Sequence, residues 1–151
     1  MKGVIVLNSV LFAFFILILY AIAHYIAKIR TSKQFTKGII QLLEQSHTGR
    51  IKSLDWTFRV DEQVKHDLIY PLSLEQVIQI RQCKDPLEKS FVYQIAKFEM
   101  SQQIAVAKVN VSIDFDDPLS QTRIHLSNIP ITIHCRLVSK EGWVVWKVCH
   151  S

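Results

Sequence analysis

The feature that most constrains this 151-residue chain is an apolar run near its N-terminus that contains no formal charge. The run covers 24 residues, 4–27. As an α-helix it would be about 36 Å long, which exceeds the roughly 30 Å hydrocarbon core of a bilayer. A cleaved signal peptide has a shorter apolar core of about 7–15 residues. The sequence therefore predicts an uncleaved transmembrane anchor over residues 1–28, with the lipid bilayer as its first partner.

The net charge of +5 is concentrated next to this run. Residues 1–52 hold seven basic side chains and one acidic one, whereas residues 53–151 hold eleven basic and twelve acidic ones. We expect Lys28, Arg30, Lys33 and Lys37 to contact anionic lipid headgroups at the membrane surface. A nucleic-acid binder would carry its basic residues on the folded domain instead, so we expect no nucleic-acid partner.

The same charges leave the orientation in the membrane open. Four basic residues follow the run, and the positive-inside rule then places the C-terminal domain in the cytoplasm. A tail of three residues before the run is, however, typical of anchors whose C-terminal domain is exported. The two signals oppose each other.

Residues 29–49 predict a juxtamembrane amphipathic helix. Phe35, Ile39, Leu42 and Leu43 follow the spacing i, i+4, i+7, i+8, which puts them on one stripe, and Gly49 is a stop signal. One interpretation packs the stripe against the protein's own domain. The other makes it a candidate partner face for further subunits of a membrane complex.

Residues 50–151 predict an α+β domain. Leu54, Trp56 and Phe58 alternate with polar residues, which favours a short strand, and Ser73 with Gln76 forms a capping box that begins a helix. We expect the inward face of that helix to hold Leu74, Val77 and Ile78.

The remainder alternates as β-strands do, over residues 91–99, 104–115, 122–138 and 143–149. The apolar phase changes near Ala107 and Lys108, which predicts a β-bulge there. Pro130 predicts that its strand lies at an edge or is broken at that point. The fold class is therefore α+β, with a curved antiparallel sheet and packed helices.

The last two strands form a hairpin, and its register determines whether Cys135 and Cys149 can form a disulfide. If Val138 pairs with Trp143, Ile133 and Cys135 share a face with Trp146, and Lys147 points away from them. Cys149 then lies on the opposite face from Cys135, so we expect no disulfide between them.

The sequence offers little for catalysis. The dipeptides His134–Cys135 and Cys149–His150 contain zinc-type ligands, but adjacent strand residues point to opposite faces and no CxxC spacing occurs. Asp114, Asp116 and Asp117 fit a turn before a proline. With four glycines in the chain and no Gly-rich phosphate loop, we expect no catalytic residue, no metal and no cofactor.

The strand order in residues 90–149 suggests a family. An aromatic strand (SFVYQIAKF) precedes a long hairpin (IAVAKVNVSIDF, TRIHLSNIPITIHCRLV), which is closed by SKEG and GWVVWKV. After a single N-terminal span, this order resembles the TraE-type inner-membrane subunit of conjugative and type IV secretion systems. The resemblance implies a periplasmic domain with a nuclear-transport-factor-two-like fold, which is a curved sheet wrapped by helices. It also implies a non-enzymatic assembly factor in the bacterial inner membrane.

A pilin-like subunit of a type IV pilus or type II secretion assembly is the alternative. Lys2 and Gly3 before an apolar helix imitate a short prepilin leader. Asn8, however, stands at the fifth position after Gly3, where pilins carry Glu. Both classes are compatible with a homo-oligomer.

Overall fold

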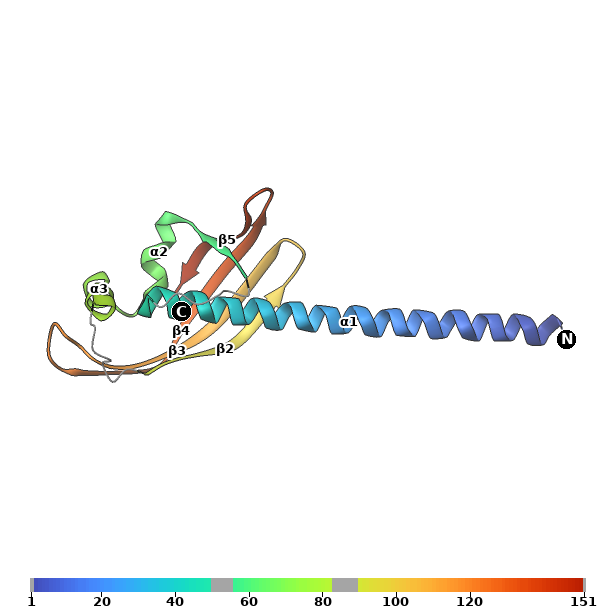
Figure 1. Cartoon of the computed structure of the whole chain (residues 1–151), viewed down its shortest axis with the longest axis horizontal. Coiled ribbons are helices and arrows are strands. Elements are labelled where there is room, and N and C mark those ends of the chain that lie inside the picture. The colour runs from blue at the N-terminus through green and yellow to red at the C-terminus, as the bar shows by residue number, and fades with distance from the viewer. Residues whose placement is uncertain (1, 50–55, 83–89, 151) are drawn as a thin grey trace. The chain divides into compact units, whose positions relative to one another are not determined.

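The structure is a computed structural model that describes residues 2–49, 56–82 and 90–150. It contains two compact units, Met1–Gln34 and Phe35–Ser151. The boundary falls inside the first helix, α1 (Lys2–Thr48), so the segment predicted as one juxtamembrane helix is shared between the units. Figure 1 shows the elements of each unit.

The first unit is the N-terminal part of α1. Every residue from 2 to 30 is exposed, including Phe12, Phe14 and Leu17 at 65%, 61% and 64%. The helix is long and apolar enough to cross a membrane. An apolar surface on all sides of a helix is typical of a transmembrane segment.

The second unit is an α+β domain, as predicted. After α1 come β1 (Phe58–Val60), α2 (Glu62–Leu68), α3 (Leu74–Gln82), β2 (Ser90–Met100), β3 (Ile104–Asp116), β4 (Arg123–Val138) and β5 (Gly142–Cys149). The sheet order is β1-β5-β4-β3-β2. The prediction of a wholly antiparallel sheet is wrong, because β1 fills the free edge of β5 in parallel orientation.

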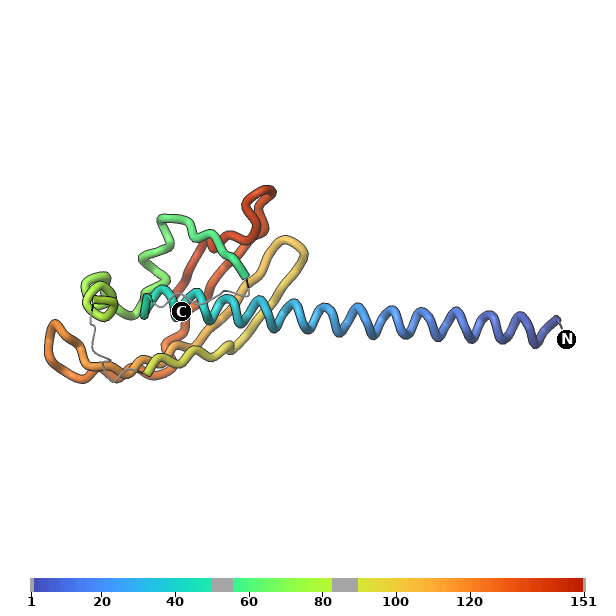
Figure 2. The backbone as a smooth tube through the Cα atoms, viewed as in Figure 1, coloured from blue at the N-terminus to red at the C-terminus, as the bar shows by residue number. Residues whose placement is uncertain are grey.

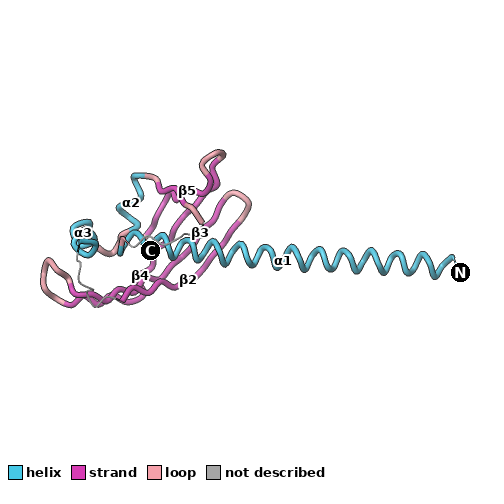
Figure 3. The backbone as a smooth tube through the Cα atoms, in the orientation of Figure 1, coloured by secondary structure: helices cyan, strands magenta, loops and turns pink. Residues whose placement is uncertain are grey.

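The residues of α1 from Phe35 to Thr48 pack with α2 and α3 against one face of this sheet (Figure 3). The inward positions of β3 alternate without interruption from Ala105 to Phe115 and are all buried. An irregularity does lie where the bulge was predicted, opposite Lys108 and Val109, but the extra residue is in β2 and not in β3. Ile104 and Val106 belong to the outward face, and the irregularity lies in the partner strand β2, between Ile95 and Lys97.

A second irregularity lies between β3 and β4. The pairing shifts between Val111 and Ile113, and Asn128 on β4 adopts a positive φ of 54° while its N–H donates to the Ser112 hydroxyl at 3.1 Å. The β3–β4 pair changes direction along its length (Figure 2), as bulges allow. Pro130 pairs with β3 on one side, whereas the pairing to β5 begins only at Thr132. Its position at a local edge is confirmed.

The register predicted for the closing hairpin holds only in its outer half. Thr132 pairs with Cys149 and His134 with Lys147 as expected, but a bulge before Cys135 moves the inner half by one residue. Trp143 is consequently the buried tryptophan, 7% exposed, and Trp146 lies beside His134 with the ring centroids 6.0 Å apart. The prediction had these two tryptophans exchanged, because a one-residue slip turns every later side chain over.

The capping box of α3 is confirmed. The Gln76 N–H donates to Ser73 Oγ at 3.2 Å, and the Ser73 N–H donates to Gln76 Oε1 at 2.9 Å. The inward residues are Val77 and Ile80, whereas Leu74 and Ile78 are exposed. The predicted strand around Leu54 reduces to β1, and Leu54 itself lies outside the described residues.

Candidate functional site

The four basic residues next to the apolar run are all exposed. Lys28, Arg30 and Lys33 belong to the first unit and Lys37 belongs to the second. Exposure is what contact with lipid headgroups requires, and that contact stays a prediction.

The stripe predicted as a candidate partner face lies in the core of the domain. Phe35, Ile39 and Leu43 are 0% exposed and Leu42 is 8% exposed. They pack against the protein's own sheet, because the apolar face of this helix and the inward face of β3 bury each other. The interpretation as packing on the protein's own domain describes this placement, whereas a partner face would need exposed side chains.

Phe35 is the centre of an aromatic cluster that begins the packed part of α1. Its ring centroid lies 5.1 Å from Trp56, 5.0 Å from Phe58, 5.6 Å from Phe98 and 5.0 Å from Trp143. Three of these four contacts have the edge-to-face geometry that aromatic rings prefer. The cluster ties α1 to β1, β2 and β5 at once.

Gly38, one helical turn after Phe35, lets Trp56 and Phe58 approach α1 closely. A Cβ at this position would lie 3.0 Å from Trp56 Cβ and 3.1 Å from Phe58 Cε2. Because both contacts are shorter than ordinary van der Waals separation, the absence of a side chain at Gly38 sets the distance between α1 and β1.

At the other end of the packed segment, His47 is fully buried and hydrogen-bonded on both ring nitrogens. Nε2 lies 3.1 Å from the Ile69 carbonyl, which can only accept, so Nε2 carries the proton. Nδ1, 2.7 Å from the Tyr93 hydroxyl, is then the acceptor. Burial lowers the pKa of His47, and the charge of Arg81 acts in the same direction. Burial also raises the pKa of Tyr93, so both groups are neutral near pH 7.

The sequence interpretation used residues 47–49 only as the end of a helix and missed this role of His47. The signal was available, because Phe35, Ile39, Leu43 and His47 are spaced by four residues and share one helix face. A polar side chain that continues an apolar stripe predicts a buried hydrogen-bonded group.

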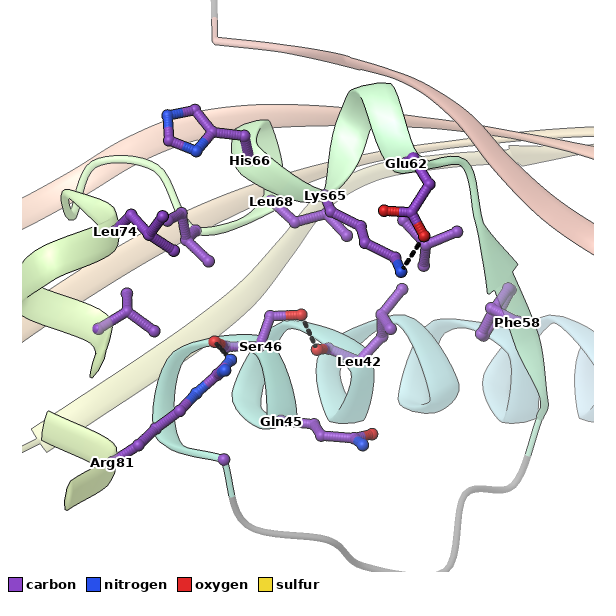
Figure 4. Close-up of a pocket in the computed structure, with 14 residues that line it drawn as sticks. Leu42, Gln45, Ser46, Phe58, Glu62, Lys65, His66, Leu68, Leu74 and Arg81 are labelled. Carbon is purple, nitrogen blue, oxygen red and sulfur yellow. Dashed lines mark hydrogen bonds and ion pairs between the residues drawn. The ribbon is translucent and has the colours of Figure 1, made fainter. Parts of the chain in front are cut away.

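A cavity of about 720 Å³ lies between the last turns of α1, the strand β1, and helices α2 and α3 (Figure 4). Its apolar lining is Leu42, Phe58, Val60, Leu68, Ile69, Leu74 and Val77. Its other lining residues are Gln45, Ser46, Gly49, Glu62, Lys65, His66 and Arg81. A cavity of this size and composition can take an apolar group between polar rims.

The charged groups around the cavity have structural partners. Lys65 Nζ lies 2.6 Å from Glu62 Oε1, and the Arg81 guanidinium donates to the Ser46 carbonyl at the end of α1. A basic side chain at that position is favourable because helix C-termini carry partial negative charge. The Arg81 contact ties α3 to the end of α1, whereas the Lys65–Glu62 pair lies within α2. Among the described residues that line the cavity, no nucleophile is shown next to a base.

Cys135 and Cys149 are free thiols, as predicted, with Cys135 buried and Cys149 half-buried. Burial raises the pKa of Cys135 to about 12, which keeps the thiol protonated and inert. Among the described residues, no group of three or more His, Cys, Asp or Glu side chains is placed to hold a metal ion. Asp117 instead accepts hydrogen bonds from Gln76 and from the Leu119 N–H, both at 2.9 Å, which is the turn chemistry predicted for this segment.

Comparison with known proteins adds no relative. The chain matches no family model, no curated protein and no solved structure. Its function is therefore argued from the apolar helix, from the packing of the domain and from the placement of its charged side chains.

Proposed function

We propose that this protein is a single-pass membrane protein whose α+β domain acts as a non-enzymatic assembly or scaffold subunit of a bacterial envelope complex. The observation that carries the proposal is the N-terminal helix, whose apolar side chains are exposed on every side along residues 4–27. A surface of this kind is stable in lipid and not in water. The chain is thus fixed at a membrane, where subunits of envelope complexes act.

The chemistry of the domain supports a structural role. Among the described residues, the buried polar groups are His47 and Asp117, and both hold helices and turns in place through hydrogen bonds to neighbouring elements. The buried thiol of Cys135 has a raised pKa, which is opposite to the shift that activates a nucleophile. These groups stabilise a fixed shape that a complex can assemble around.

The proposed setting is a secretion or conjugation system of the inner membrane, with the domain in the periplasm. It is supported by the resemblance in residues 90–149, where an aromatic strand, a long hairpin and a closing KEGW turn follow one another after a single span. Its partners would be other membrane subunits or further copies of this chain.

Membrane fractionation of cells that produce the full chain tests the anchor. The protein is expected to stay in the membrane after carbonate extraction and to keep its full length. Recovery of a shortened, soluble form would refute the proposal. An N-terminus cleaved after Gly3 and methylated on Val4 would instead establish the pilin-like alternative.

The orientation is tested by treating intact cells with a thiol reagent that cannot cross membranes. A domain outside the cytoplasm predicts labelling of Cys149 in the intact system. Labelling only after the membrane is opened would place the domain in the cytoplasm and would contradict the secretion-system setting.

A further inference from the structure

We propose that the outward face of the sheet carries a second membrane-contact site, a patch of mixed apolar and basic side chains that binds anionic lipid headgroups. This inference rests on the proposed anchoring of the chain. The outer-face patch consists of Ile104, Val106, His134, Arg136, Trp146 and Lys147. It lies on the face of the sheet opposite to the helices.

The strand register brings these residues together. Ile104 pairs with Arg136, and Val106 pairs with His134, which pairs in turn with Lys147 on β5. The bulge before Cys135 turns Trp146 onto this face, where the Arg136 guanidinium lies 5.6 Å from the centroid of the indole. Ile104 is 56% exposed and Trp146 is 36% exposed, so the patch presents a large aliphatic and an aromatic side chain among cations.

The charge of the patch is positive. Arg136 and Lys147 are exposed, and the acidic residues nearest in the strands are already paired, Glu99 with Lys97 at 3.1 Å and Glu141 with Arg59. The other end of the β3–β4 pair is acidic, since Asp114 and Asp116 lie there with Arg123. The sheet therefore attracts an anionic lipid surface at the end that carries the patch and not at the other end.

The covalent link to the anchor puts that end within reach of the bilayer. The cluster around Phe35 includes Phe98 and Trp143, so the second unit begins at the end of the sheet that carries the patch. Phe35 is eight residues beyond Ala27, and eight residues span at most about 29 Å even when fully extended. The tether therefore limits how far this end of the domain can lie from the bilayer, which raises the effective concentration of lipid headgroups around it.

A lipid surface fits the composition of the patch better than an acidic peptide does. Trp side chains favour the membrane interface because the indole has an apolar body and one N–H donor, and neighbouring Arg and Lys attract anionic headgroups. Each basic residue near such a surface contributes about a fivefold gain in association, so Arg136 and Lys147 together contribute about thirtyfold.

The test uses the full chain reconstituted into vesicles of phosphatidylcholine, with or without a minor fraction of phosphatidylglycerol. Headgroup spin-labelled lipids quench tryptophan fluorescence, and subtraction of a Trp146→Phe variant isolates the signal of Trp146. We expect quenching of Trp146 in the anionic vesicles, and its loss in Arg136→Gln/Lys147→Gln or at high salt. Arg123→Gln, at the other end of the sheet, is the matched control and should leave the quenching unchanged.

The outcomes separate this inference from the proposed function. A chain that floats with the vesicles while Trp146 stays unquenched overturns the patch and leaves the anchor intact. A chain that does not float overturns both. Shielding of Trp146 that depends on the protein-to-lipid ratio, and not on the anionic lipid, would show a second copy on this face and would overturn the lipid assignment.

Discussion

Substitution of Phe35 by alanine tests whether the C-terminal part of α1 is a core helix of the domain or a helix that binds a partner. Phe35 is 0% exposed, and its ring contacts four aromatic rings at centroid distances of 5.0–5.6 Å. Phe→Ala substitutions in cores cost about 3–5 kcal/mol, from lost burial together with the cavity that is left behind. The four ring contacts argue against the low end of that range, because aromatic pairs add about 0.5–1.5 kcal/mol beyond burial.

We therefore expect Phe35→Ala to lower the free energy of unfolding by about 4 kcal/mol, which is a thousandfold change in the folding equilibrium. A domain of this size should lose about 15 °C in melting temperature. A small domain has only about 5–15 kcal/mol in total, so the variant is expected to be partly unfolded at physiological temperature.

The assay is denaturant unfolding of the full chain in detergent micelles, followed by tryptophan fluorescence. Trp56 and Trp143 report on the cluster directly, because their ring centroids lie 5.1 Å and 5.0 Å from that of Phe35. Phe14→Ala is the matched control, since Phe14 is 61% exposed in the apolar run and its loss should leave the domain's midpoint unchanged. A cost below about 1 kcal/mol for Phe35→Ala would refute the core assignment, because even Ile→Val substitutions in cores typically cost 0.5–1.5 kcal/mol.

Three further predictions follow from the packing. Gly38→Ala should lower stability measured by thermal unfolding, because the new Cβ would lie 3.0 Å from Trp56 Cβ, and this clash should outweigh the roughly 0.5–1 kcal/mol that Ala gains over Gly inside a helix; a raised midpoint would show that the neighbouring segment moves aside freely. Since burial lowers the pKa of His47 below its ordinary 6.5, stability should be complete above that pH and fall as the pH drops, by up to about 1.4 kcal/mol per pH unit; a His47→Gln variant that keeps the same acid sensitivity would contradict this. In the native protein Cys149 should react with a thiol reagent well before Cys135, whose pKa is raised to about 12 by burial, and equal rates in a quantified labelling time course would disprove the burial of Cys135.

Local patterns predicted the elements of this protein better than their pairing. The apolar run, the capping box at Ser73 and the strands β2 to β5 carry signals within a few residues of themselves, and the structure has them. The direction of β1 is different, because its three residues pair with β5 more than 80 positions away. Nothing within a three-residue segment encodes whether such a pair is parallel.

In the closing hairpin, one extra residue in β5 made the predicted register wrong for the half next to the turn. The register predicted from the sequence, with Val138 opposite Trp143, keeps Lys147 away from the isoleucines, and that register exists in the outer half of the hairpin. Near the turn, a bulge shifts the pairing by one residue, so Trp143 and Val145 are buried and Trp146 points outward. Alternation alone cannot distinguish one register from two registers joined by a bulge.

The bulge also connects the packing of the domain with the proposed membrane contact. Without it, Trp146 would share a face with Ile133 and Cys135, and the outward face would lose the indole that lies between His134 and Arg136. With it, the indole lies beside Arg136 at the end of the sheet where Phe35 begins the packed helix. Trp146 is 36% exposed and is not among the buried side chains that form the core cluster. A residue that the core does not need, placed among cations near the tether, is therefore available for binding lipid.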